Sequence, residues 1–375
     1  MNSEVRLLLF GDICPTADYE VLFHSGKEAL FHNVLPLLQN ADIAVCNLEC
    51  PATTESDPIV KTGPSLRARP DIIPLLKDAG FHAVSLANNH ILDYGEKGVL
   101  DTLTLCKKYG LSYFGGGIHS QEAALPLIVE VKGLRIGFVS FAEHEFNVAT
   151  ESTPGASLFD PYVSLETIRS AKEKCDYLVV QYHGGIEHYI YPSPLLQKKC
   201  RAMVDAGADF VSCQHSHCIG TQETYKGVTI LYGQGNSVFG YREGNTSWNE
   251  GWLLELILSD KVEVIYHLLS AQKDGIHYNP NSECRKAEFD AQSAQLLTDG
   301  FISSSWQSFC RKNAPWYLPM LSGWNRIGNK LNRLSKGRLF KLCQSKRAVM
   351  TTTNLLHCDA HLELTITALE EIQKG

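Results

Sequence analysis

The sequence predicts an α/β fold in which helices cover a sheet. Between residues 5 and 258, short apolar runs rich in Val, Ile and Leu alternate with segments of helical periodicity. This alternation is typical of buried strands that are joined by helices. A chain of 375 residues with 44% hydrophobic and 20% charged residues is long and apolar enough for one large domain with an appendage.

Eight apolar runs are predicted as strands because glycine or polar residues bound each of them. They are Val5–Phe10, Ala44–Cys46, His82–Leu86, Arg135–Phe141, Tyr177–Tyr182, Asp209–Cys213, Val228–Tyr232 and Trp252–Leu258. The run at 252–258 is expected to be the last strand. Five further segments have helical spacing of apolar residues. They are Leu30–Leu38, Ile72–Ala79, Gly98–Tyr109, Ser164–Lys174 and Leu195–Ala206.

The pattern changes after about residue 270. Residues 274–286 are polar and are expected to form a loop, whereas residues 287–375 have helical character. We therefore predict two parts: residues 1–270 as the α/β domain, and residues 271–375 as a linker followed by a helical, basic C-terminal extension.

Charge is divided unevenly along the chain. Residues 301–358 contain ten Lys and Arg residues and no Asp or Glu, so the remainder has 24 basic and 41 acidic residues, a formal charge of −17. An acidic body argues against nucleic-acid binding. Ile327, Leu331 and Leu334 lie at helical spacing between basic residues, a pattern that suits peripheral contact with an anionic membrane or an anionic polymer. The alternative is a solvated helix that packs on the domain.

The ends of the chain and its cysteines give weaker indications. No apolar run reaches the roughly 18 residues that a membrane helix needs. The first apolar stretch is stopped by Asp12 and is too short for a secretory signal, so we expect a cytoplasmic protein, with any membrane association through the extension. Twelve cysteines without a Cys-x-x-Cys pair argue against a zinc knuckle or a thioredoxin-type site.

Polar residues follow five of the predicted strands. They are Asp12, Glu49, Asn89, His90, His183, His215 and His217. In an open α/β sheet, ligands bind beyond the carboxyl ends of the strands, so we expect these side chains to converge. Carboxylates and imidazoles suit one or two ions of Zn, Mn or Fe. The His-x-His spacing would place both imidazoles on one face of a strand. Taken singly, each residue could instead be a cap, a turn former or a structural histidine.

These motifs resemble a known family. The ordered set Gly11-Asp12, Asn47-Leu48-Glu49, Asn89-His90, His183 and His215-Ser216-His217 is similar to the calcineurin-like metallophosphoesterase superfamily. Within it, the chain is most similar to the bacterial capsule-synthesis proteins of the poly-γ-glutamate, CapA type. The similarity covers residues 5–270, and it rests on the combination of motifs rather than on any one of them.

The resemblance implies a four-layer α-β-β-α sandwich and a divalent metal centre. Its implied metal positions are Asp12, Glu49, Asn89, His183, His215 and His217. Glu49 would bridge two ions, and water activated by the metal would attack a phosphoester or related bond. Asp12 and His90 are the implied catalytic residues, with His90 as proton donor or oxyanion stabiliser.

Two departures from the superfamily pattern concern the metal positions. The usual Asp-x-His of the first motif is Asp12-Ile13-Cys14, and the usual second-motif Asp is Glu49. The loss of an imidazole at position 14 weakens one metal position, which leaves a single-ion centre open. Cys14 could ligate only as a thiolate.

Four further residues are predicted to bind the substrate. They are Lys61, Arg67, Glu187 and Asn236. Arg67 could clamp a phosphate or carboxylate with two hydrogen bonds, or it could be a solvated loop charge. Glu187 could orient His183 instead of contacting substrate.

Two functions follow as hypotheses. The first is a metal-dependent hydrolase in capsule or poly-γ-glutamate biosynthesis, acting on a phosphoester or anionic polymer together with the capsule-synthesis machinery. The second is a non-catalytic accessory protein that uses the metal pocket to bind an anionic chain or a partner enzyme.

Overall fold

The structure is a computed structural model that describes residues 4–16, 18–280, 282–320, 326–343, 345–357 and 369. The chain divides into two compact units, Met1–Ser303 and Ser304–Gly375. This division differs from the predicted parts 1–270 and 271–375, because the segment after residue 270 continues the sheet of the first unit.

The first sheet of unit 1 has eight strands. In the order in which they pair they are β16 (Gly275–Asn279), β15 (Val262–Gln272), β14 (Glu250–Leu258), β1 (Val5–Ile13), β2 (Ile43–Leu48), β3 (Ala83–Ser85) and β4 (Ser112–Phe114), with β13 (Asn236–Val238) also paired to β1. Strands β1 to β4 are parallel, as is β13 to β1, whereas β14, β15 and β16 run antiparallel to their neighbours.

The second sheet has six strands. In pairing order they are β11 (Gln222–Tyr225), β12 (Val228–Leu231), β10 (Phe210–Gln214), β9 (Tyr177–His183), β7 (Leu134–Ala142) and β6 (Leu127–Val131). The four central strands are parallel, and the two edge strands are antiparallel. A small two-stranded sheet joins β5 (Gly116–Gly117) and β8 (Gly155–Ala156).

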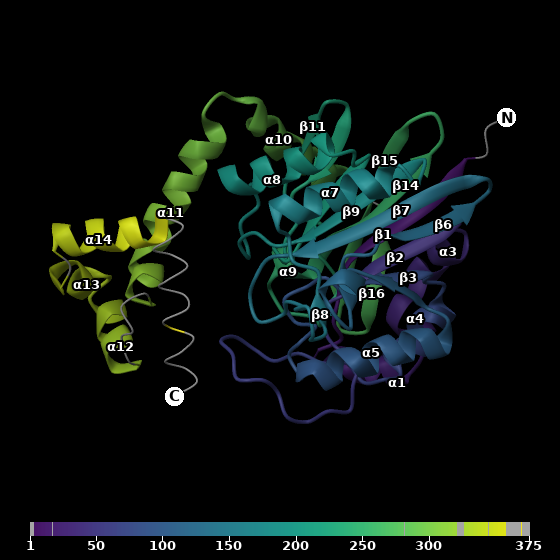
Figure 1. The fold of residues 1–375 in the computed structure, drawn as a ribbon, viewed down its shortest axis with the longest axis horizontal. Coiled ribbons are helices and arrows are strands. Elements are labelled where there is room, and N and C mark those ends of the chain that lie inside the picture. Colours follow the sequence, from purple (N-terminus) through teal and green to yellow (C-terminus); the bar gives the residue numbers. More distant parts are fainter. Residues whose placement is uncertain are drawn as a thin grey trace. The chain divides into compact units, whose positions relative to one another are not determined.

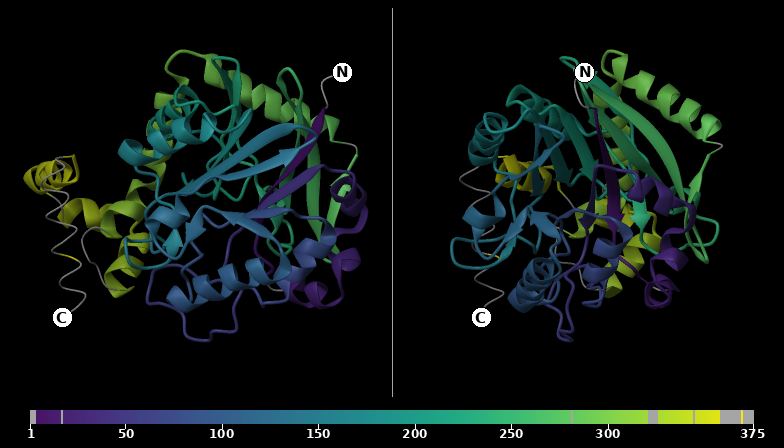
Figure 2. Two further views of the ribbon diagram at one scale, coloured as in Figure 1. Left: turned by 45° about the vertical axis from the view of Figure 1, so that its right-hand side comes forward. Right: turned by 90° about the vertical axis from the view of Figure 1, so that its right-hand side faces the viewer.

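Helices cover the outer face of each sheet. Beside the first sheet lie α1 (Asp18–His24), α2 (Lys27–Phe31), η1 (His32–Val34), α3 (Leu35–Gln39), α4 (Ile72–Ala79) and α5 (Gly95–Tyr109). Beside the second sheet lie α7 (Pro161–Lys172) and α8 (Pro194–Asp205). The remaining elements of unit 1 are α6 (Ser120–Ala123), α9 (Thr246–Asn249), α10 (Glu283–Ala294) and η2 (Gln295–Leu297). Figures 1 and 2 show α4 and α5 on one side of the paired sheets and α7 and α8 on the other.

Strand β1 shows why the layers form. Leu7 and Leu9 pack between the two sheets, whereas Leu8 and Phe10 pack under the helices of the first sheet. Side chains alternate across a strand, so a strand buried on both faces must be apolar throughout. The continuous apolar run of β1 is therefore the sequence signature of an inner layer, and the predicted four-layer α-β-β-α sandwich is confirmed.

The predicted strands and helices are found, with three differences. Trp252–Leu258 is not the last strand, because β15 and β16 follow it, and α10 occupies part of the segment expected to be a loop. Strand β15 alternates between half-buried and exposed residues over much of its length, so its apolar signal is weak. The predicted helix Leu30–Leu38 is divided into α2, η1 and α3.

Unit 2 is helical, as expected for the extension. Its helices are α11 (Phe301–Met320), which begins in unit 1, α12 (Arg326–Leu334), α13 (Arg338–Cys343) and α14 (Lys346–His357). The backbone N–H of Phe340 in α13 donates to the Asn332 Oδ1 of α12 at 2.9 Å, and Asn332 is buried. Among the described residues, no helix is both long and apolar enough to cross a membrane.

Strands β1, β13 and β14 cross so closely that two glycines are required. A Cβ on Gly11 would lie 2.4 Å from the carbonyl oxygen of Gly235, and one on Gly251 would lie 2.1 Å from that of Asn236. The neighbouring atoms belong to the backbone and cannot move aside without shifting a strand.

We expect Gly11→Ala to lower the free energy of unfolding by about 1–3 kcal/mol, because the added methyl group overpacks this crossing. Urea denaturation would measure the change. Gly98→Ala is the control, since the nearest atoms to its Cβ are 3.2 Å away and alanine favours the interior of α5. Equal midpoints for wild type and Gly11→Ala would contradict the prediction.

Candidate metal centre

The candidate site is built from strand ends of both sheets. Asp12 lies near the end of β1 and Glu49 directly follows β2, while Asn89 and His90 follow β3. From the second sheet, His183 ends β9 and His215 follows β10. Parallel strands that end at the same edge bring together residues that are far apart in the chain. The strand ends of the two sheets thus bring Asp12, Glu49, His183 and His215 close together.

Five buried residues form two groups of potential metal ligands. Glu49, His183 and His215 form one group, and Asp12, Glu49 and His217 form the other; within each group, one ligand atom per residue lies within 4.8 Å of the others. Glu49 Oε1 is 3.4 Å from His183 Nε2 and 3.8 Å from His217 Nε2. The carboxylate of Glu49 is therefore shared between the groups.

The backbone at the paired histidines differs from the prediction. Both residues follow β10, which ends at Gln214, and both have left-handed φ angles, 88° for His215 and 49° for His217. The expectation that they share one face of a strand is wrong. The backbone N–H of His215 donates to Asp12 Oδ2 at 3.1 Å, which helps to hold this unusual bend against β1.

Asn236 contacts the ring of His217. Its Oδ1 lies 2.8 Å from His217 Nδ1, and its Nδ2 donates to the backbone carbonyl of Trp248 at 2.9 Å. The rings of Phe239 and Trp248 lie 4.7 and 5.0 Å from that of His217. These contacts orient the ring so that the Nε2 of His217 points toward Glu49.

Amides supply most of the remaining contacts. Asn89 Oδ1 lies 2.9 Å from His183 Nε2. Asn47, which was not among the predicted site residues, donates to Asp12 Oδ1 at 2.7 Å and lies 3.1 Å from His183 Nδ1. Asn88 donates to Asn47 Oδ1 at 3.2 Å. Both residues stand inside motifs of the sequence, so their neighbourhood in the chain was the available signal.

The charges of the site are set by burial. Burial, together with the nearby Glu49 carboxylate, raises the pKa of Asp12 to about 7, and burial also raises the pKa of Glu49 well above its ordinary value. Burial lowers the pKa of His183 to about 4 and that of His215 to about 3, and it lowers the pKa of His217 well below its ordinary value. The imidazoles are therefore neutral at pH 7, which is the form that binds metal.

The residues fit a divalent cation. Within the described part of the chain, neither carboxylate oxygen of Glu49 nor the Nδ1 of His215 has a hydrogen-bond partner. Buried polar atoms without partners are costly, and two adjacent buried carboxylates need a compensating charge. A cation such as Zn, Mn or Fe would satisfy both requirements with this set of nitrogen and oxygen donors.

Cys14 lies outside both ligand groups formed by the described residues. Its side chain is fully buried, and burial together with a hydrogen bond to Cys50 raises its pKa well above the ordinary value. A neutral thiol paired with another thiol is a poor metal ligand. The geometry thus gives no support to Cys14 as a substitute for the usual imidazole.

His90 is held by the buried side chains of Asp93 and Lys61. Its Nδ1 is 2.6 Å from Asp93 Oδ2 and 3.2 Å from Lys61 Nζ. Lys61 also forms an ion pair with Asp93, and only 3% of its side chain is exposed. The ammonium group of Lys61 therefore lies between the Asp93 carboxylate and the His90 ring.

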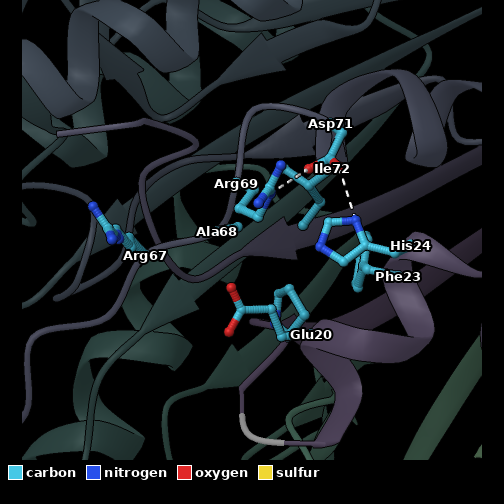
Figure 3. Close-up of a pocket in the computed structure, with 9 residues that line it drawn as sticks. Glu20, Phe23, His24, Arg67, Ala68, Arg69, Asp71 and Ile72 are labelled. Carbon is cyan, nitrogen blue, oxygen red and sulfur yellow. Dashed lines mark ion pairs between the residues drawn. The ribbon is translucent and has the colours of Figure 1, made fainter. Parts of the chain in front are cut away.

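Arg67 and Glu187 lie at exposed positions. The Arg67 guanidinium donates to the backbone carbonyl of Glu55 and lies 5.1 Å from the centroid of the Tyr94 ring. It borders a shallow pocket with Arg69 and Asp71, but in Figure 3 its side chain points away from them. Glu187 is exposed, and its charge helps to raise the pKa of the buried Glu49.

Two residues near the centre had no signal in the sequence. Glu145 Oε1 is 4.0 Å from His215 Nε2, and burial raises the pKa of this glutamate. The Arg242 guanidinium lies 3.1 Å from the centroid of the Trp248 ring, which in turn packs on His217. Only the Trp248 ring thus separates the Arg242 cation from the candidate ligand His217.

Together, the sandwich fold and the buried carboxylate–imidazole groups define an α/β protein with a candidate metal centre at the junction of its sheets. Residues 6–241 match the family described as bacterial capsule synthesis protein PGA_cap. The chain belongs to this bacterial capsule-synthesis family.

Three described relatives are similar to this chain in sequence. The capsule biosynthesis protein CapA of Bacillus anthracis is 31% identical over 277 residues, which cover 71% of this chain and 64% of the relative. The PGA biosynthesis protein CapA of Bacillus subtilis is 31% identical over 66% of this chain and 63% of its own length. A probable polyglutamine synthesis accessory protein of Mycobacterium tuberculosis is 29% identical over 55% of this chain and 58% of its own. The match therefore spans less than two thirds of each relative.

Solved structures with a similar course of the chain include two from Thermus thermophilus. A 5'-nucleotidase precursor matches 79% of this chain and 59% of its own, with a TM-score of 0.42 and 14% identity. A hypothetical protein matches 70% of this chain and 99% of its own, with a TM-score of 0.45 and 16% identity.

We expect the affinity of the centre for Mn²⁺ to rise between pH 5.5 and 7.5. Below its pKa of about 7, Asp12 keeps a proton that a cation must displace, whereas the histidines are already neutral. Each displaced proton changes the affinity by up to about tenfold per pH unit. Calorimetric titrations in buffers of different ionisation enthalpy would count the protons. In Asp12→Asn the count should fall by one; a pH-independent affinity would refute the assignment.

Proposed function

We propose that this chain is a metal-dependent hydrolase that acts on a phosphoester or related bond in capsule or poly-γ-glutamate biosynthesis. The observation that carries the proposal is the pair of buried ligand groups that share Glu49. Membership of the capsule-synthesis family supports the biosynthetic setting. When bound, a divalent cation would supply Lewis-acid stabilisation of the charge that develops on the reacting group.

His90 is the residue we propose to deliver a proton to the leaving group. Its contact with Asp93 fixes the ring through Nδ1 and leaves Nε2 to face a substrate. Asp93 itself accepts a hydrogen bond from the backbone N–H of Leu66 at 2.6 Å and pairs with Lys61. Because the Nδ1 side of the His90 ring is already fixed, the ring loses little conformational freedom when the substrate binds.

Recognition of an anionic substrate requires positive charge at the entrance. Glu145 and Glu187 are negative, so the bound cation and Arg242 would have to offset them. Arg242 is suited to this role because its guanidinium is packed on Trp248 beside the centre. Arg67 remains a second candidate for substrate contact, at greater exposure to solvent.

The alternative is a non-catalytic accessory role, in which the centre binds an anionic chain or a partner enzyme of capsule synthesis. The replacement of an imidazole by the buried thiol of Cys14 favours it, because one metal position then has fewer strong donors. The mycobacterial relatives described as probable accessory proteins are consistent with such a role.

Hydrolysis of aryl phosphomonoesters and phosphodiesters with Mn²⁺ tests the first proposal. We expect His217→Ala to lower kcat/KM by more than about 100-fold, because it removes a ligand atom of the centre. His24→Ala is the matched control, since His24 pairs with Asp71 at the surface. Metal analysis of both variants would show whether activity follows metal content.

If the metal-bound protein turned over no member of a broad panel of phosphoesters and γ-glutamyl amides, the proposed hydrolase activity would be contradicted. Retention of a poly-γ-glutamate chain or a capsule-synthesis enzyme by the same inactive protein would then support the accessory role. Loss of that retention in His217→Ala would connect the binding to the centre.

We also propose that α12 contacts anionic membrane surfaces. Ile327, Leu331 and Leu334 lie on one face of α12 and are 70%, 51% and 74% exposed. The buried Asn332 faces α13 instead. Basic residues without any acidic neighbour between 301 and 358 complement anionic lipid headgroups.

The full chain should bind vesicles that contain phosphatidylglycerol, and Leu334→Ser should weaken this binding by about tenfold or more, since a leucine contributes about 1.5–3 kcal/mol when it leaves water. Co-sedimentation would measure it. Leu297→Ser provides the matched control, because Leu297 is 83% exposed but belongs to unit 1. Equal binding to neutral and anionic vesicles, or unchanged binding of Leu334→Ser, would contradict the proposal.

A further inference from the structure

A second cluster of metal-binding side chains lies at the edge of the first sheet, in residues that the proposed function does not use. His32, Asp274 and His277 each offer one ligand atom, and these atoms lie within 4.8 Å of one another. The two imidazole rings stack with centroids 4.3 Å apart and planes 14° apart. Both rings direct Nε2 to Asp274: His277 to its carboxylate at 3.1 Å and His32 to its backbone carbonyl at 2.8 Å.

The cluster joins two segments that are distant in the sequence. His32 begins η1, whereas Asp274 and His277 belong to the turn and strand of the β15–β16 hairpin. Strand β16 is the edge strand of the eight-stranded sheet. A cation held by all three residues would therefore tie an edge strand to the helical layer.

Both segments are anchored independently of the cluster. The Tyr19 hydroxyl contacts the carbonyl oxygens of Gln272 and Gly275 at 2.7 and 2.8 Å. Asn33 exchanges two hydrogen bonds with the backbone of Tyr278, at 2.9 and 2.8 Å. The three donors are thus preorganised by contacts that do not depend on a ligand, which lowers the entropic cost of binding one.

Backbone conformation adds a second observation. His32 has a φ of 38°, which is uncommon for a residue with a side chain, and strain of this kind persists only where the surroundings enforce it. Gly275 permits the close approach, because a Cβ there would lie 2.9 Å from the His32 ring and 2.7 Å from the carbonyl oxygen of Ala29. The chain therefore holds an imidazole, instead of a glycine or asparagine, at a strained position that faces two other donors.

We propose that His32, Asp274 and His277 form a second metal site that takes Zn²⁺ and fastens the β15–β16 hairpin to η1. Two imidazoles and one carboxylate are a common zinc ligand set, and tetrahedral zinc needs its ligand atoms about 3.4 Å apart. The Asp274 side chain is 64% exposed, so water can complete the coordination. The site shares no residue with the central groups.

Zinc binding to tag-free, chelator-treated full-length protein tests the proposal. We expect His277→Ala and Asp274→Asn each to lose one equivalent of tightly bound Zn²⁺, with affinity at this site weakened by more than about 100-fold. His24→Ala, which alters a surface histidine–carboxylate pair, should retain the wild-type stoichiometry. Co²⁺ in place of Zn²⁺ should give the visible absorption of a tetrahedral centre, and that absorption should decrease in both variants.

A third variant distinguishes zinc binding at the central site from zinc binding at this one. Glu49→Gln, which changes the residue that both central groups share, should keep the equivalent that His277→Ala loses, and Zn²⁺ should raise its Tm, whereas this rise should be smaller in the Glu49→Gln/His277→Ala double variant. If the central groups bind no metal at all, wild type would still bind one equivalent that depends on His277. Zinc stoichiometry and Tm shifts that are the same in wild type, His277→Ala and Asp274→Asn, with circular dichroism showing all three folded, would overturn the proposal.

Discussion

Two carboxyl groups buried at the junction of the sheets constrain the whole centre. Asp12 and Glu49 are 1% and 0% exposed, and burial raises the pKa of both. A pair of carboxylates in such surroundings must hold a proton or meet a positive charge. The histidines beside them cannot supply it, because burial also lowers their pKa values and keeps them neutral. In the absence of a cation the two carboxyl groups therefore keep a proton, and a cation from outside the chain could replace it.

The sandwich is what buries this junction. Strands of both sheets end there, and the layer between the sheets is filled by apolar side chains up to the ligands. The close crossing of β13 and β14 brings Asn236 to His217, and it depends on Gly251, which has no side chain to separate the strands. Packing and ligand orientation therefore depend on each other, because a shift of β13 would move the His217 imidazole as well as the core.

The sequence predicts what depends on local chemistry or on burial on both faces. Helix α4 has its predicted bounds, since its apolar spacing is regular and Gly80 ends it in a left-handed conformation. The convergence of Asp12, Glu49 and the histidines followed from their places at strand ends. The bend at His215 could not be foreseen, because it depends on a hydrogen bond to Asp12, a residue 203 positions away. Glu145 and Arg242 belong to no pattern, and β15 lacked a continuous apolar run.

The two ligand groups differ in their chemistry, and this difference bears on the replacement at position 14. The group of Glu49, His183 and His215 is rich in nitrogen, whereas that of Asp12, Glu49 and His217 is rich in oxygen. Nitrogen-rich sites suit zinc and iron, and oxygen-rich sites suit manganese. An imidazole at position 14 would have added nitrogen beside Asp12; the chain has there a free thiol that is hydrogen-bonded to Cys50, and the Asn47 amide donates to Asp12. The replacement therefore leaves the two ligand groups unequal in donor type.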